Sequence, residues 1–292
     1  MRPMSSKNAN NGLKKGMGIH ARRVLAYVVL IIMTFLCLFW FYVLFINATR
    51  SNSEIQRGFS AIPGSRLAAN WRSLMNDSLP FVHGMINSLI VAALTALCAV
   101  YFSAMTAYSI HAYEYKGRKA IYTFILAVMM IPSQVTILGF VDLIRGMNLM
   151  NNFLPLIITS VASPAVFFFM KQYMDSSLPL ALIEAARIDG SGEFRTFNQI
   201  VLPIMKPAIA VQAIFSFVSS WNNYFVPVQI LQKNDMKTLP ILIAQLRAAD
   251  WKKFDMGEVY MAIAFSIFPV VVVYLILSKY IVGGVAAGSV KG

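Results

Sequence analysis

Six segments of this chain run for 18 to 23 residues without Asp, Glu, Lys or Arg. A helix needs about 20 apolar residues to cross the hydrocarbon core of a bilayer, so each segment is long enough to span a membrane. Hydrophobic residues make up 58% of the chain and charged residues only 13%, a balance typical of membrane proteins. The sequence predicts an all-α integral membrane protein with six transmembrane helices at residues 24–46, 88–110, 120–141, 153–170, 208–230 and 259–278.

The basic residues lie in the tails and loops rather than on one face, which argues against nucleic-acid binding despite a net charge of +13. With the N-terminus inside, the inner pieces hold 15 Lys and Arg and the outer loops hold 10. The positive-inside rule therefore predicts cytoplasmic N- and C-terminal tails, at 1–23 and 283–292, and an extracytoplasmic loop at 47–84. Segment 24–46 exceeds the apolar core of a signal peptide, about 7 to 15 residues, and is expected to be retained.

Side chains that carry chemistry are sparse. Cys37 and Cys98 both lie inside predicted spans without a CxxC spacing, and the three histidines form no ligand cluster, so no metal site or catalytic residue is predicted. A secondary transporter would carry an ionisable residue deep in a span for ion coupling, and the six segments have none. An intramembrane enzyme would need a carboxylate, histidine or nucleophile constellation at depth, which the spans also lack.

A polar hairpin is predicted at residues 176–203, between the fourth and fifth spans. Pro179 suits the first turn of a helix, and Gly190 can take the left-handed conformation that closes one. Ser191 is placed to cap a second helix over 193–201, which Pro203 ends. Spacing alone leaves two interpretations open: the hairpin docks on another protein, or it rests on the membrane surface as an amphipathic element.

The pattern of this hairpin resembles the signature loop of bacterial ABC-importer permeases: Glu-Ala-Ala at 184–186, Gly190, and Ile-Val-Leu-Pro at 200–203. The sequence SWNNYFVP at 220–227 and the tail GGVAAGSVKG at 283–292 resemble the carbohydrate-uptake group, the maltose-type inner-membrane permeases with six spans. The resemblance implies a type I ABC importer permease fold, with the transporter domain at 85–282, in the inner (plasma) membrane of a bacterium.

The same resemblance implies a function and partners. The chain would be a non-catalytic permease that moves a sugar or oligosaccharide, or alternatively a non-sugar solute, through the membrane. It would pair with a homologous second permease, receive solute from an extracytoplasmic binding protein and dock on two cytoplasmic ATP-binding subunits. The chain has no GxxxxGK[S/T] phosphate loop, so ATP and Mg would bind the partner ATPase and this chain would hold no cofactor. The resemblance implies coupling residues at Glu184, Ala185, Ala186, Asp189, Gly190, Leu202 and Pro203.

Polar side chains inside spans are the candidates for a solute pathway. Polar groups are costly in the hydrocarbon region, so they face a cavity or another helix. Gln134 follows a proline in the third span, and Asn222, Asn223 and Tyr224 interrupt the fifth. Amides and an aromatic ring suit a polyhydroxylated sugar, but ordinary hydrogen bonding between helices would use the same residues.

Overall fold

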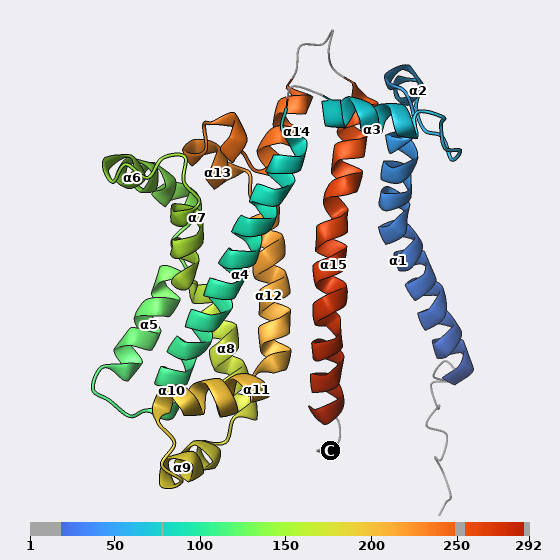
Figure 1. The fold of residues 1–292 in the computed structure, drawn as a ribbon. Coiled ribbons are helices and arrows are strands. Elements are labelled where there is room, and N and C mark those ends of the chain that lie inside the picture. The colour runs from blue at the N-terminus through green and yellow to red at the C-terminus, as the bar shows by residue number, and fades with distance from the viewer. Residues whose placement is uncertain (1–18, 77–78, 249–254, 289–292) are drawn as a thin grey trace, which may run out of the picture.

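A computed structural model of the protein describes residues 19–76, 79–248 and 255–288, and in that part of the chain the regular structure is all helical. Four helices dominate (Figure 1): α1 (Ile19–Ala48), α4 (Phe81–Ala112), α12 (Lys206–Trp221) and α15 (Met256–Gly288). The remaining α-helices are α2 (Asn52–Gln56), α3 (Leu67–Asn76), α5 (Arg118–Val128), α6 (Ser133–Gly146), α7 (Leu154–Ile158), α8 (Pro164–Ser177), α9 (Leu180–Ile188), α10 (Glu193–Thr196), α11 (Leu202–Ile204), α13 (Phe225–Ile230) and α14 (Leu239–Arg247). Short 3₁₀ turns cover Thr159–Val161 and Asn234–Met236, and a π-helical turn covers Phe197–Val201.

Helix α4 is the centre of the bundle and packs on both α8 and α12. Helix α12 in turn packs on α15, and α15 on α1. Small side chains such as Ala92, Ala104 and Ala107 are fully covered along α4, which lets the neighbouring backbones approach closely. One apolar cluster joins α4 and α8 to the hairpin, and a second joins α4, α12 and α14 to α15.

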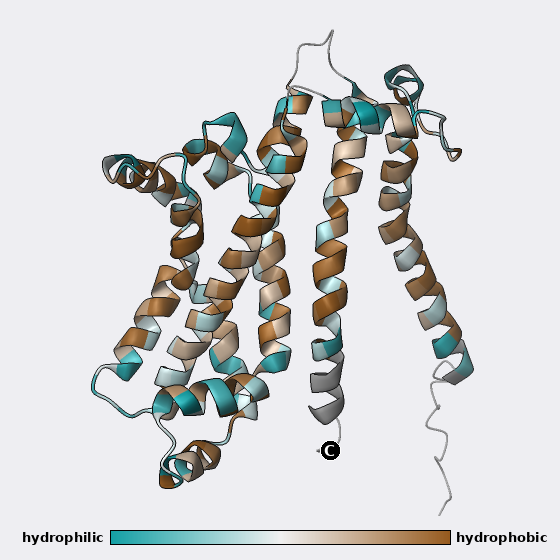
Figure 2. Ribbon diagram, in the orientation of Figure 1, coloured by the Kyte–Doolittle hydropathy of each residue, from teal (hydrophilic) through white to brown (hydrophobic). Residues whose placement is uncertain are grey.

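Within the described residues, four helical stretches are long and apolar enough to cross a membrane: Arg22–Ala48, Phe81–Ala112, Leu154–Ser177 and Met256–Ile281. A fifth is counted if the bent pair Glu193–Ile204 and Lys206–Trp221 forms one span. The predicted spans 24–46, 88–110 and 259–278 lie within three of these stretches, and the span 153–170 overlaps the third from residue 154. Figure 2 shows apolar residues along most of α1, α4 and α15, with hydrophilic residues gathered toward the ends of the bundle.

The predicted span 120–141 is interrupted and is not one continuous helix. Helix α5 ends at Val128 and α6 begins at Ser133, because Pro132 has no N–H to donate and its ring blocks a continuing helix. With 11 residues α5 is about 16 Å long, which is shorter than a hydrocarbon core of about 30 Å. Helix α6 turns away across the end of the bundle (Figure 1).

The predicted span 208–230 is also interrupted. Helix α12 ends at Trp221 and α13 begins at Phe225. Pro227 cannot donate to the carbonyl of Asn223 four residues earlier, so the helical ladder stops there. The Asn223 side chain instead accepts a hydrogen bond from the Val226 N–H at 3.3 Å. The amides that mark this span in the sequence therefore stand at a break between two helices.

The hairpin helices lie at the same end of the bundle as the first residues of α1 and the last residues of α15 (Figure 1). Helices α2 and α3, which occupy part of the predicted loop 47–84, lie at the opposite end. Helix α15 continues to Gly288, into the predicted tail 283–292. Residues 1–18 and 289–292 of the two predicted tails lie outside the described residues.

The end of α1, helix α3 and the start of α15 are held together by close backbone packing. Asn70 donates its amide to the carbonyls of Ala48 and Arg50, at 2.9 and 3.0 Å. A Cβ added to Gly257 would lie 2.5 Å from the Arg50 carbonyl oxygen and 2.6 Å from the Asn70 amide.

We expect Gly257→Ala to lower the free energy of unfolding by about 1 to 3 kcal/mol, because a backbone atom cannot move aside. Thermal unfolding of the purified protein in detergent measures the change. Gly146→Ala is the matched control, since nothing lies within 4 Å of its added Cβ. Equal midpoints for the two variants would contradict the packing argument.

Candidate functional site: a projecting hairpin and a hydroxyl-lined cavity

Gly190 closes the C-terminal end of α9, as the sequence predicts, two residues after Ile188. Gly190 has φ of 76°, in the left-handed region that favours glycine. Its N–H donates to the Arg187 carbonyl at 3.0 Å, and the Ser191 N–H donates to the Ala186 carbonyl at 2.9 Å. These two bonds form a Schellman motif, which satisfies the last carbonyls of the helix and turns the chain back. Gly190 therefore sets the angle between the two arms of the hairpin.

The second arm differs from its prediction. Gly192, not Ser191, is the N-cap of α10, and the Ser191 hydroxyl accepts a hydrogen bond from Thr196 instead. The helix passes through a π turn at Phe197–Val201, where the Leu202 N–H donates to the Phe197 carbonyl, and continues to Ile204. Pro203 has no N–H for a regular bond, and the chain then bends by 82° into α12.

Glu193 ties the two arms of the hairpin to each other and to the bundle. Its carboxylate accepts a hydrogen bond from Arg187 of α9 at 2.8 Å and another from the Tyr108 hydroxyl of α4 at 2.9 Å. The Arg187 guanidinium also lies 5.0 Å from the centre of the Tyr113 ring. The hydrogen bond to Glu193 raises the pKa of Arg187. Displacement of α9 would thus pull on α4 through a short polar chain.

The predicted coupling residues divide between two faces of α9. Ala186 is buried against the protein's own bundle together with Ile183, whereas Glu184, Ala185 and Asp189 are exposed. Helix α9 also carries exposed apolar side chains at Leu182 and Ile188, and Phe194 of α10 is exposed as well. Farther along, Leu202 is half-buried and Pro203 is exposed.

Helix α9 projects beyond the ends of α4, α8 and α12, past α10 and α11 (Figure 1). Glu184 makes no hydrogen bond or ion pair within the described part of the chain. The projecting face thus combines a carboxylate without a partner, a small residue beside it and apolar side chains at its edges. Such a surface is suited to a protein groove.

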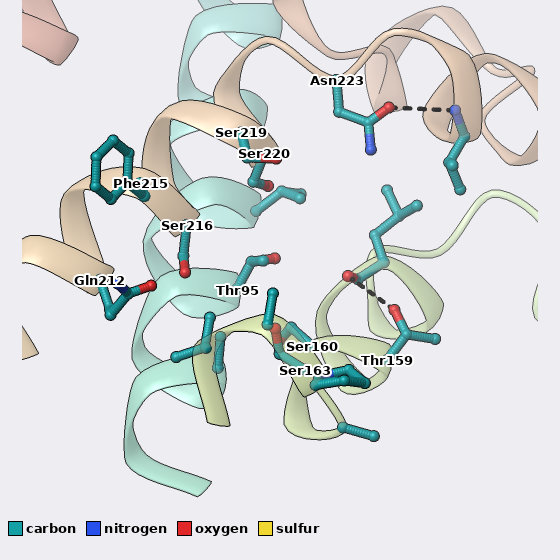
Figure 3. Close-up of a pocket in the computed structure, with 18 of the residues that line it drawn as sticks. Thr95, Thr159, Ser160, Ser163, Gln212, Phe215, Ser216, Ser219, Ser220 and Asn223 are labelled. Atoms are coloured by element: carbon teal, nitrogen blue, oxygen red, sulfur yellow. Dashed lines mark hydrogen bonds between the residues drawn. The ribbon is translucent and has the colours of Figure 1, made fainter. Parts of the chain in front are cut away.

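A second feature is a cavity of about 670 Å³ between α4, the turn that joins α7 to α8, and α12. Thr95, which lines it, lies halfway along α4, so the cavity is at mid-height in the bundle. Figure 3 shows polar side chains from all three elements directed toward the same space. The hydroxyl and amide side chains that line it are Ser88, Thr95, Thr159, Ser160, Ser163, Gln212, Ser216, Ser219, Ser220, Asn223 and Thr238.

Of the four predicted pathway residues, one lines this cavity. Asn223 does, at the break after α12. Asn222 and Tyr224 are exposed and do not line it, and Gln134 is exposed on α6, away from it. The residues missed in the sequence follow helical spacing, with Gln212, Ser216 and Ser219 at i, i+4 and i+7 along one face of α12.

Metal-ligating side chains are dispersed in the described residues. No group of three His, Cys, Asp or Glu side chains in that part of the chain could hold a metal ion. Cys37 and Cys98 are both free thiols in helices of the bundle.

Together the apolar helices, the projecting hairpin and the polar cavity define a polytopic helical membrane protein of the transporter class. Residues 99–286 match the family described as binding-protein-dependent transport system inner membrane component. The chain belongs to this family and is an inner-membrane component of an ABC transporter. Members of the family are transport subunits rather than catalysts.

Two relatives agree with this assignment, and a solved structure shares the fold. The arabinooligosaccharides transport system permease protein AraQ of Bacillus subtilis (strain 168) is 31% identical over 276 residues, 92% of this chain and 96% of AraQ. The sn-glycerol-3-phosphate transport system permease protein UgpE of Yersinia pestis bv. Antiqua (strain Antiqua) is 30% identical over 267 residues, 89% of this chain and 95% of UgpE. A chain from the crystal structure of a bacterial ABC transporter involved in the import of the acidic polysaccharide alginate shares the fold, with a TM-score of 0.76 and 21% identity over 89% of this chain and 96% of that one.

Proposed function

We propose that this chain is the permease subunit of an ATP-driven ABC importer and forms, with a second homologous permease, the membrane pathway for a sugar or oligosaccharide. The observation that carries the proposal is the projecting hairpin, with Gly190 closing α9 and Glu184 presented outward without a partner in the described chain. The family supplies the transport class, and the names of the relatives favour sugars and related solutes.

The proposed topology has six crossings with both tails in the cytoplasm. Helix α5 with the residues that lead from it to Pro132 makes the third crossing, and α12 with α13 makes the fifth. This arrangement puts the hairpin, the start of α1 and the end of α15 on the same side, as their common position at one end of the bundle supports (Figure 1). It also places in the cytoplasm the tails and loops that hold more of the Lys and Arg residues. The transporter domain is taken as 85–282.

Coupling is proposed to act through the outer face of α9, with Glu184, Ala185 and Asp189 against a groove of a cytoplasmic ATP-binding subunit. Ala186, Leu202 and Pro203 then shape the hairpin from within rather than contact the ATPase. Two such subunits would hold ATP and Mg, and this chain would bind no cofactor. An extracytoplasmic binding protein would deliver the solute; one structural relative is a bacterial alginate ABC transporter in complex with a periplasmic protein bound to alginate pentasaccharide.

The test is reconstitution of the complete complex in proteoliposomes, with ATP enclosed and the loaded binding protein outside. Uptake of labelled sugars that requires both ATP and the binding protein is the expected result. Uptake driven by a proton or sodium gradient without ATP would identify a secondary transporter instead. ATP-dependent uptake of an amino acid or a metal ion, with no sugar carried, would keep the ABC class and reject the sugar.

We expect Asn223→Leu to reduce sugar uptake by about 5- to 100-fold in a manner that differs between sugars. The substitution removes an amide that lines the cavity, and an unsatisfied polar contact costs about 1 to 3 kcal/mol. Uptake across several sugars, normalised to assembled complex, measures the effect. Asn222→Leu is the matched control because its side chain is exposed and does not line the cavity. A uniform loss that follows complex abundance would make Asn223 a structural residue.

The solutes in the names of the relatives differ in charge. Arabinooligosaccharides are neutral, whereas glycerol phosphate and alginate are anionic. Relationship to these proteins therefore leaves the charge of the solute open.

A further inference from the structure

The charge of the solute can be argued from the cavity between α4, the α7–α8 turn and α12. Among the described residues that line it, none is Asp, Glu, Lys, Arg or His. The polar groups there are hydroxyls and two amides, which donate and accept hydrogen bonds without fixing a charge. An anion inside a helical bundle needs a cation or several aimed donors, because uncompensated charge in a low dielectric is strongly unfavourable.

The arrangement of the hydroxyls also suits a solute with many hydroxyls of its own. The Thr95 and Thr238 hydroxyl oxygens are buried in the wall of the cavity and have no hydrogen-bond partner among the described residues. Thr159 and Ser160 donate to backbone carbonyls of their own turn, so their oxygens remain available as acceptors. Gln212 adds an amide at the start of the polar face of α12.

Aromatic surface completes the lining. Phe169 of α8 and Phe215 of α12 both line the cavity and are 54% and 64% exposed. An aromatic ring packs well on the C–H faces of a sugar ring. Hydroxyls, amides and open aromatic rings without charge match a neutral carbohydrate and match a phosphate ester or a uronate poorly.

We propose that this cavity is the solute site of the chain and that it selects neutral carbohydrates against anionic ones, with the polar face of α12 as the selecting element. The proposal rests on the function proposed above. Ser216 lies at the centre of that face, between Gln212 and Ser220, and so is the position at which an added charge should change the selection.

The experiment uses the complete importer in proteoliposomes with saturating loaded binding protein. A panel of arabinose, xylose and glucose trisaccharides identifies the best neutral substrate, and the corresponding trisaccharide with a terminal uronic acid is its anionic partner. For the natural chain we expect uptake of the neutral sugar to exceed uptake of the uronate by at least about tenfold. Ser216→Lys should lower that ratio by about tenfold or more, since the ammonium compensates the carboxylate, while Ser216→Asn should keep it.

The variants show whether this chain or the binding protein sets the preference for neutral sugars. A preference set by the binding protein alone would give the same ratio in Ser216→Lys and Ser216→Asn complexes, and this result overturns the proposal. Equal uptake of both sugars by the natural chain also overturns it. Ser219→Lys repeats the test from the next turn of α12 if Ser216→Lys does not assemble. If no sugar of either charge is carried but another solute is, the proposed sugar function fails first, and the cavity argument fails with it.

Discussion

An importer that carries Gly190→Pro should lose ATP-dependent uptake almost completely while the protein still reaches the membrane. The native φ at this position is 76°, and proline holds φ near −65°. Proline also removes the N–H that donates to the Arg187 carbonyl. A misplaced proline costs about 3 kcal/mol or more. The fraction of molecules whose hairpin has the native turn at position 190 should therefore fall by roughly a hundredfold.

The loss of uptake should differ among substitutions at position 190 according to the backbone strain that each one introduces. Gly190→Ala keeps the N–H and meets nothing within 4 Å, but the left-handed conformation costs an alanine about 1 to 2 kcal/mol. Gly190→Asn should be milder still, because asparagine tolerates this region. Gly192→Ala is the matched control: it is two residues away, has an ordinary φ of −67° and has open space at its Cβ.

Copurification of the ATP-binding subunit and uptake per assembled complex are the two measurements. Loss of copurification would mean that the hairpin holds the ATPase. Retained copurification with ATP hydrolysis but no uptake would mean that the hairpin transmits its motion. Wild-type uptake by Gly190→Pro would reject any role of this turn in coupling.

The sequence predicted most reliably the features that depend on local chemistry. Four of the six apolar segments lie in helices long enough to span, because length and composition decide that property. Gly190 ends α9 as predicted, since a left-handed position after a helix favours one residue type. The break in the segment 120–141 was visible as Pro132, but a hydropathy window averages over a proline and conceals it.

The features that were missed depend on contacts between distant residues. Glu193 and Tyr108 are 85 positions apart, so no local pattern in the sequence links them. The cavity was missed because serine and threonine are equally compatible with packing between helices, and only their convergence from three elements distinguishes a lining. Gln134 had the right chemistry for a pathway, but α6 turns away at Pro132 and carries it to an exposed position.

Reversal of charge at Glu184 should be the second large effect. Glu184 lies exposed on the projecting face of α9 and has no hydrogen bond or ion pair in the described chain, so its carboxylate contributes little to the fold of this subunit. If it meets a basic residue in the ATPase groove, Glu184→Ala leaves that residue unpaired, at a cost of about 2 kcal/mol or more. Glu184→Lys adds repulsion between like charges and should weaken docking further, by at least another tenfold.

Glu114→Lys is the matched control, because Glu114 is also exposed, in the loop between α4 and α5 at the same end of the bundle. It introduces the same change of charge outside the hairpin, in the loop between α4 and α5, and should leave uptake unaltered. The affinity of the membrane-embedded complex for the purified ATP-binding subunit, measured at low and high salt, gives the comparison. High salt should restore part of the affinity lost in Glu184→Lys, because it screens like charges that face each other near water. The affinity of the Glu184→Ala complex should change little with salt. Equal weakening by the two substitutions, independent of salt, would show that α9 docks through its shape and its apolar edges at Leu182 and Ile188 rather than through a charge contact.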